Sequence, residues 1–171
     1  MPRIAVVADS TVGVDPDYAA KHDVRIVPLT IQMRGRSLKE GVDITPAQFY
    51  AELPHCNPLP TTSQPSAGDF VQVYRALEAD GYDGIVSVHL SSGISGTCAS
   101  AELAARELGI AVEVVDTRCA ASASLFPLEA AVRVAERGAD LPVVAETARR
   151  VAAAQHTVFA VDTLEYLYKG G

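Results

Sequence analysis

Short, largely apolar runs that end at a polar residue recur along this chain and alternate with helical patterns. The runs cover residues 4–8, 24–29, 85–90, 112–115 and 157–161, and residues 31–33 extend the second run. Such short apolar runs are typical of strands that are buried on both faces of a parallel sheet. Parallel strands are joined by crossover helices, which pack on those faces. The sequence therefore predicts an α/β fold with a mostly parallel sheet and helices on both faces.

Helix signals fill the intervals between these runs. Asp15-Pro16 and Thr45-Pro46 each combine an N-cap residue with proline at the first helical position. Ser66 and Asp69 have the spacing of a capping box, with Asp in place of the usual Glu. Apolar residues at positions 70, 73, 74 and 77 then mark one helical face. Further helices are expected from residue 97 to about 109, at 124–137 and at 142–154, and a tight turn is expected at 34–37.

The composition excludes several classes of protein. The 171 residues suffice for one domain, and the formal net charge of −7 argues against binding to nucleic acid or to anionic membrane surfaces. No apolar run approaches the ~20 residues that a membrane span needs, and the N-terminus lacks the pattern of a signal peptide. We therefore expect a cytoplasmic protein without an integral membrane segment. The three cysteines form no CxxC pair, so we expect neither a metal site nor a disulfide.

Polar residues follow the predicted strands at the point where each strand ends. Asp9 and Ser10 follow the first strand, Ser91 and Ser92 follow the strand at 85–90, and Asp116 follows the strand at 112–115. Ligands of open α/β sheets bind at the carboxyl ends of the strands. The sequence therefore predicts a ligand site at this edge of the sheet.

Two loops rich in hydroxyl groups precede predicted helices. Residues 60–66 read PTTSQPS, and residues 91–97 read SSGISGT. Hydroxyl groups beside the free backbone N–H groups of a helix N-terminus suit an anion. The glycines at positions 93 and 96 permit a close approach of the backbone to a ligand. The same residues also serve as ordinary helix caps, above all Ser66 and Thr97, and spacing alone leaves both interpretations open.

Neither loop contains Lys, Arg or His. A multiply charged phosphate usually needs such a cation or a metal, and the P-loop pattern is absent. A single carboxyl group is the better match, because hydroxyl and amide donors satisfy it at roughly 1.5–3 kcal/mol per charge-assisted bond. An apolar tail would supply the remaining affinity at ~0.8 kcal/mol per buried CH₂ group.

These segments resemble the DegV family of bacterial fatty-acid-binding proteins. The other matching segments are ADST at 8–11, VPL at 27–29, EGVDI at 40–44, FY at 49–50, DT at 116–117, DTLEYL at 162–167 and KGG at 169–171. The resemblance covers the chain in order, and the two loops together are highly specific. Asp116-Thr117 replaces the more usual Asp-Ser, which keeps a hydroxyl group at the second position.

The resemblance implies a carrier, not an enzyme. Such a chain binds a long-chain fatty acid such as palmitate and presents it to a dihydroxyacetone-kinase-like fatty acid kinase, whose product enters phospholipid synthesis. The kinase supplies the phosphoryl chemistry, so no cofactor is expected. The expected site residues are Thr62 and Ser95 for the carboxylate, Ser63 and Ser92 beside them, and Asp9, Ser10 and Asp116 in support.

The resemblance also implies two α/β domains, although members of the family are longer than this chain. We expect residues 1–155 to form the domain that binds the lipid head group. Residues 156–171 would begin a second, lipid-binding domain that is truncated here.

Two other functions fit parts of the sequence. GISGT at 93–97 nearly matches G-x-S-x-G, and Ser95, Asp116 and His156 follow in the chain order of an α/β-hydrolase triad. The last glycine of that pattern is replaced by Thr97, however, and His156 precedes a predicted strand. A nucleotide-binding domain would want G-x-G-x-x-G after the first strand, which is absent. A serine hydrolase therefore remains the alternative to fatty acid binding.

Overall fold

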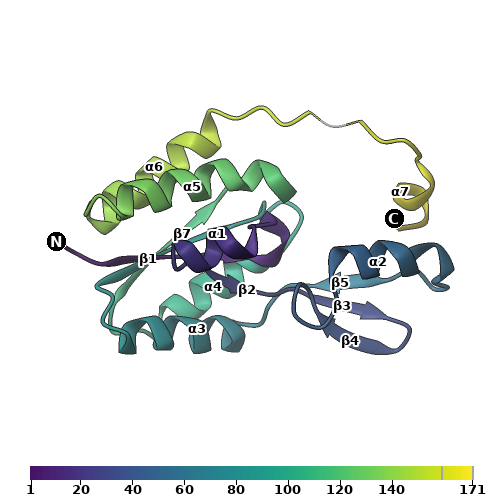
Figure 1. Ribbon diagram of the computed structural model, residues 1–171, viewed down its shortest axis with the longest axis horizontal. Helices are drawn as coiled ribbons and strands as arrows, with labels where there is room; N and C mark the ends of the chain where they lie inside the picture. The colour runs from purple at the N-terminus through teal and green to yellow at the C-terminus, as the bar shows by residue number, and fades with distance from the viewer. Residues whose placement is uncertain (159, 171) are drawn as a thin grey trace.

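The computed structural model describes residues 1–158 and 160–170 and confirms the α/β class. Its described strands include a parallel sheet in the order β2-β1-β6-β7, formed by β1 (Ile4–Asp9), β2 (Arg25–Val27), β6 (Gly84–His89) and β7 (Ala111–Asp116). Helices α5 (Leu125–Ala135) and α6 (Leu141–Ala153) cover one face, and α3 (Ala67–Ala79) and α4 (Thr97–Ala105) cover the other (Figure 1). Helix α1 (Pro16–Lys21) packs with α5 and α6 against the first face.

The predicted caps form at Asp15, Thr45 and Ser66, whereas the expectation for Thr97 is wrong, because Thr97 is the first residue of α4 and Gly96 takes the N-cap position. Asp15 accepts hydrogen bonds from the backbone at the start of α1. Thr45 opens α2 (Pro46–Glu52) with a complete capping box, and Ser66 and Asp69 form a second one at α3. Asp69 reaches back to the Ser66 backbone N–H at 2.8 Å, so the shorter Asp side chain fills the role that Glu usually has.

The parallel sheet divides the core into two layers. Strand residues alternate between the two faces, so Val6 and Ala8 pack under α5 and α6, while Ala5 and Val7 pack against α3 and α4. The three cysteines are free thiols. The apolar strand runs of the sequence are thus explained by burial on both faces.

A second, smaller sheet departs from the sequence prediction. Strands β3 (Thr30–Met33), β4 (Arg36–Lys39) and β5 (Thr61–Ser63) form an antiparallel sheet in the order β4-β3-β5, beside the parallel one (Figure 1). The predictions that residues 31–33 continue the second strand and that 61–63 belong to a loop are therefore wrong. Strand β5 pairs with β3, about thirty residues earlier, and local patterns do not show such a partner. The turn expected at 34–37 does form, with positive φ at Arg34 and Gly35.

The strand expected at 157–161 is absent from the described residues of that segment; residue 159 lies outside them. A strand forms where a neighbouring strand pairs with it. Among the described strands β7 lies at the edge of the parallel sheet and pairs only with β6, so the described residues of the segment 157–161 do not pair with it. The remaining elements are the short helices η1 (Ser10–Val12), η2 (Leu53–His55), η3 (Ala121–Ser124) and α7 (Glu165–Gly170). None of the described helices has the length and apolar character that crossing a membrane requires.

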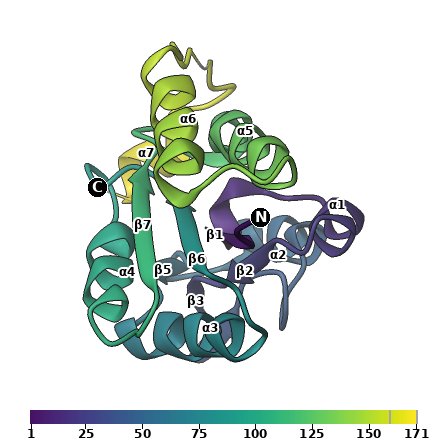
Figure 2. The same cartoon turned by 90° about the vertical axis from the view of Figure 1, so that its left-hand side faces the viewer.

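The strand order places a topological switch point between β1 and β6. The chain proceeds from β1 outward to β2 on one side, and then from β6 outward to β7 on the other (Figure 2). Crevices at the carboxyl ends of strands open at such points. Asp9 ends β1 and His89 ends β6, so these two residues stand at the base of the expected crevice.

We expect truncation of the Leu77 side chain to destabilise the domain strongly. Leu77 of α3 is fully buried in the layer between the sheet and α3, so Leu77→Ala should lower the free energy of unfolding by roughly 2–5 kcal/mol. Leu103→Ala is the matched control, because that side chain on α4 is 54% exposed and its loss should cost less than ~0.5 kcal/mol. Urea unfolding measures both, and equal losses would contradict this account of the core.

Candidate ligand-binding site

A cavity of about 510 Å³ opens at the carboxyl ends of β1 and β6. Its walls come from the segment after β1, from β5 and the loop behind it, and from the loop that joins β6 to α4. The lining residues are Thr11, Leu29, Glu40, Thr62, Gln64, Leu90, Ser92, Gly93, Ile94, Ser95 and Gly96. Both hydroxyl-rich segments of the sequence therefore contribute to one cavity.

Thr62 and Ser95 both line this cavity, and they come from different elements. Thr62 is the central residue of β5 and pairs with Ile31 of β3, so the small sheet sets its position. Ser95 lies just before α4, where its Oγ is 2.8 Å from Thr97 Oγ1 and accepts a hydrogen bond from the Thr97 backbone N–H. Ser63 does not line the cavity, because successive residues of a strand point to opposite faces.

Ser92 is anchored by Asp116 at the end of β7. Its Oγ donates to Asp116 Oδ2 at 2.6 Å, and its backbone N–H donates to Oδ1 at 3.2 Å. Burial alone would raise the pKa of Asp116, but hydrogen bonds from Ser92 and from the Arg118 backbone hold it below its usual value. Asp116 thus stays ionised and supports the loop, while Ser92 also lines the cavity.

Glu40 is a cavity residue that the sequence did not single out. Its Oε2 accepts a hydrogen bond of 2.6 Å from Ser10 Oγ, which itself accepts from the Leu29 backbone N–H at 2.9 Å. Ser10 therefore holds Glu40 and Leu29 at the cavity wall without lining the cavity itself. In the sequence, Glu40 belongs to the segment at 40–44, which resembles a family pattern. That resemblance gave Glu40 no expected role.

Gln64 bridges the two hydroxyl-rich segments. Its side-chain amide lies so close to Gly96 that a methyl group on Gly96 would collide with it. The absence of a side chain at Gly96 therefore permits this close approach, and the backbone angle there is an ordinary one. Both residues line the cavity, so this contact closes the wall between β5 and α4.

Asp9 lies beneath the cavity and is fully buried. Its Oδ1 accepts hydrogen bonds from the backbone N–H and the hydroxyl of Thr11, and its Oδ2 accepts from the Leu90 backbone N–H and pairs with His89 Nδ1 at 3.0 Å. Burial would raise the pKa of Asp9, but the bonds from His89, Thr11 and Leu90 lower it below the usual value. An ionised Asp9 therefore joins the ends of β1 and β6.

The residues of the alternative hydrolase triad are not joined to one another. Ser95 bonds to Thr97, Asp116 bonds to Ser92 and Arg118, and exposed His156 lines a different cavity, beside Phe126. Burial, with the charges of Asp116 and Asp9, raises the pKa of the Cys98 thiol to about 12, which removes it as a nucleophile near neutral pH. The described residues include no group of three or more His, Cys, Asp or Glu side chains that could hold a metal ion.

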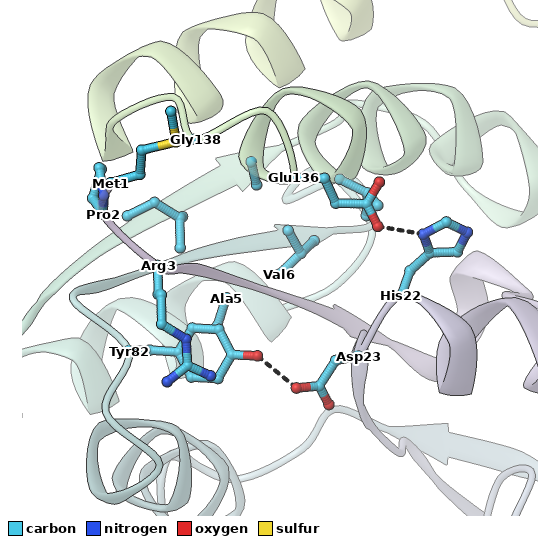
Figure 3. Close-up of a pocket in the computed structure, with 13 residues that line it drawn as sticks. Met1, Pro2, Arg3, Ala5, Val6, His22, Asp23, Tyr82, Glu136 and Gly138 are labelled. Atoms are coloured by element: carbon cyan, nitrogen blue, oxygen red, sulfur yellow. Dashed lines mark hydrogen bonds and ion pairs between the residues drawn. The ribbon is translucent and has the colours of Figure 1, made fainter.

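A second cavity, of about 300 Å³, lies at the opposite, amino-terminal end of the strands (Figure 3). Its charged side chains face one another. His22 pairs with Glu136 at 2.5 Å, the Tyr82 hydroxyl donates to Asp23 at 2.5 Å, and the Arg3 guanidinium lies 4.5 Å from the centre of the Tyr82 ring. These polar groups are committed to internal pairs, so the cavity at the switch point is the better candidate site.

Known sequences similar to this chain belong to one family. The family model described as DegV matches residues 3–171. A DegV domain-containing protein of Streptomyces coelicolor is 39% identical over 169 residues, which cover 99% of this chain and 60% of that relative. Protein DegV of Bacillus subtilis is 34% identical over 171 residues, with the same two coverages. The chain thus spans about 60% of the length of these relatives.

Solved structures show the same fold. A DegV family protein from Thermus thermophilus, described as binding fatty acid, superposes with a TM-score of 0.89 at 36% identity, over 98% of this chain and 60% of the other. DegV of Bacillus subtilis, described as a fatty acid binding protein, gives a TM-score of 0.82 at 29% identity, over 90% of this chain and 55% of the other.

Gly96→Ala should displace Gln64 without unfolding the protein, because the added methyl meets the end of a flexible, exposed side chain. We expect the side-chain amide resonances of Gln64 to shift, while the unfolding midpoint changes by less than ~2 °C. Gly93→Ala is the control, since a methyl there meets only Ser91 Oγ, at 3.4 Å. Unchanged Gln64 resonances in Gly96→Ala would refute the proposed contact.

Proposed function

Because the chain belongs to the DegV family, we propose that it binds a long-chain fatty acid through the carboxylate and presents that group to a fatty acid kinase. Thr62 and Ser95 bind the carboxylate oxygens, and Ser92 lies beside them. Asp9, Ser10 and Asp116 support this arrangement from outside the cavity. Ser63 faces away from the cavity lining and is not assigned a contact.

The observation that carries the proposal is the convergence of Thr62 and Ser95 on one cavity. The two residues are far apart in the sequence, yet both line a cavity whose lining contains no Lys, Arg or His and whose acidic residue, Glu40, already accepts a hydrogen bond from Ser10. Hydroxyl groups and backbone N–H groups suit a single carboxylate, whereas a phosphate usually needs a cation. Binding of fatty acids by the related proteins from Thermus thermophilus and Bacillus subtilis supports the same ligand here.

The acyl chain supplies most of the binding free energy in this proposal. Each buried CH₂ group contributes ~0.8 kcal/mol, so a long chain contributes on the order of 10 kcal/mol before the entropic costs of binding. Leu29, Leu90 and Ile94 form the apolar part of the cavity lining. The relatives are longer than this chain. We propose that their additional residues form a second domain, which begins near residue 156 and covers the rest of the tail.

The role of a carrier follows from where the carboxylate would lie. Ser92, Gly93 and Ile94 are exposed at the cavity, so a head group beside Ser95 is near the protein surface. A dihydroxyacetone-kinase-like kinase docked at this edge of the sheet would reach the carboxylate while the protein holds the tail. The protein supplies orientation, the kinase supplies phosphoryl transfer, and we place both in the cytoplasm.

Removing either hydroxyl should weaken fatty acid binding. For Thr62→Ala and for Ser95→Ala we expect the Kd for palmitate to rise roughly 10- to 150-fold, because each loses one hydrogen bond to a charged group. Ser63→Ala is the matched control on the same strand and should bind as the wild type does. Isothermal titration calorimetry measures all three, and an affinity that Thr62→Ala and Ser95→Ala leave unchanged would exclude these contacts.

We also expect the protein not to hydrolyse acyl esters. Ser95, Asp116 and His156 form no hydrogen-bonded relay, so Ser95 has no general base. Incubation with p-nitrophenyl palmitate should give no turnover above buffer, and a fluorophosphonate probe should leave Ser95 unlabelled in mass spectra. Turnover abolished by Ser95→Ala would instead establish the hydrolase alternative.

A further inference from the structure

A buried chain of hydrogen bonds runs behind the cavity and takes no part in the contacts described above for the ligand. It passes from Tyr74 on α3 through Ser87 and His89 on β6 to Asp9 on β1, and all four side chains are fully buried. The distances are 2.7 Å from Tyr74 Oη to Ser87 Oγ, 2.7 Å from Ser87 Oγ to His89 Nε2, and 3.0 Å from His89 Nδ1 to Asp9 Oδ2. Apolar side chains would fill the same space without the desolvation cost of these groups. The presence of a buried hydrogen-bond network at this position therefore needs a reason.

Counting the donors fixes the position of the imidazole proton. Tyr74 donates its hydroxyl proton to Ser87 Oγ, and burial raises the pKa of Tyr74, so this proton is retained. Ser87 then donates its own proton to His89 Nε2, which has to be an unprotonated acceptor. A proton on Nε2 would leave the Ser87 hydroxyl hydrogen without an acceptor in the core. His89 therefore carries its proton on Nδ1 and donates it to Asp9.

The proton on His89 Nδ1 orients the Asp9 carboxylate, which lies below the cavity and bonds to two of the residues that line it. Asp9 Oδ2 takes bonds from His89 and from the Leu90 backbone, and Oδ1 takes two bonds from Thr11. Thr11 and Leu90 line the cavity on the sides of β1 and β6, respectively. The His89 ring is itself held by an edge contact with Phe70, at a centroid separation of 5.1 Å.

We propose that His89 is a positioning residue for fatty acid binding: its Nδ1–H orients the Asp9 carboxylate, which in turn sets Thr11 and Leu90 in the cavity wall. His89 touches no ligand in this arrangement and acts only through Asp9. The inference rests on the proposed function, since the consequence of correct positioning is affinity for the fatty acid head group.

Two substitutions separate the roles of the two ring nitrogens. His89→Asn places an amide donor near the position of Nδ1 and gives up the contact with Ser87. His89→Gln places its amide near Nε2 and removes the donor from Asp9. We expect the Kd for palmitate to stay within about threefold of the wild-type value in His89→Asn and to rise at least about tenfold in His89→Gln. Tyr74→Phe disturbs the far end of the same chain and should change the Kd by less than about twofold.

Spectroscopy provides a test that needs no ligand. Long-range ¹H–¹⁵N correlation spectra of the wild-type protein should show His89 as the neutral tautomer that is protonated at Nδ1. A ring protonated at Nε2, or at both nitrogens, would overturn the inference. Urea unfolding of each variant shows that the affinities compared are those of folded proteins.

The binding outcomes distinguish this inference from the proposed function. Equal weakening of palmitate binding in His89→Asn and His89→Gln would mean that His89 only fills the core, and would overturn the positioning role. The same holds if neither variant weakens binding while Thr62→Ala does, and the proposed function would then stand. A wild-type protein that binds no palmitate would overturn the proposed function and the positioning role together.

Discussion

One buried carboxylate holds together the ends of the two central strands. Asp9 ends β1, accepts bonds from Thr11 just beyond it, and accepts bonds from His89 and Leu90 at the end of β6. An ionised group with no exposure to solvent persists only where such donors replace its hydration. The Asp9 carboxylate and its donors therefore join β1 and β6 at the base of the switch point. The cavity opens above them.

Much of the parallel sheet and most of the helix starts could be predicted from the sequence, because their causes are local. Residues 4–8 are apolar without interruption and form β1, Asp15-Pro16 and Thr45-Pro46 begin helices, and Ser66 with Asp69 forms a capping box. The candidate site was also partly foreseen, since the polar residues at strand ends meet at one edge of the sheet. Thr62 and Ser95 do line one cavity, although their contact with a ligand stays a prediction.

What the sequence did not show depends on partners distant along the chain. Thr61–Ser63 became a strand because β3 offers a free edge, and 157–161 lacks a strand in its described residues because no neighbour pairs with it. Glu40 is held at the cavity by a hydrogen bond from Ser10, which belongs to another element. The hydrogen bonds of His89 depend on Asp9, which lies 80 residues earlier in the chain, and on Ser87, so the sequence pattern does not reveal their direction.

The walls of the cavity come from the two sheets, which have separate hydrophobic clusters. Ser95 and Leu90 belong to the parallel sheet and its helices, whereas Thr62 belongs to the antiparallel sheet, whose own small cluster consists of Ile31, Met33, Ile44 and Cys56. Substitutions in that cluster can move the Thr62 wall without opening a void in the main core. A change in the antiparallel sheet can therefore reshape one wall of the cavity while the two layers packed on the parallel sheet stay as they are.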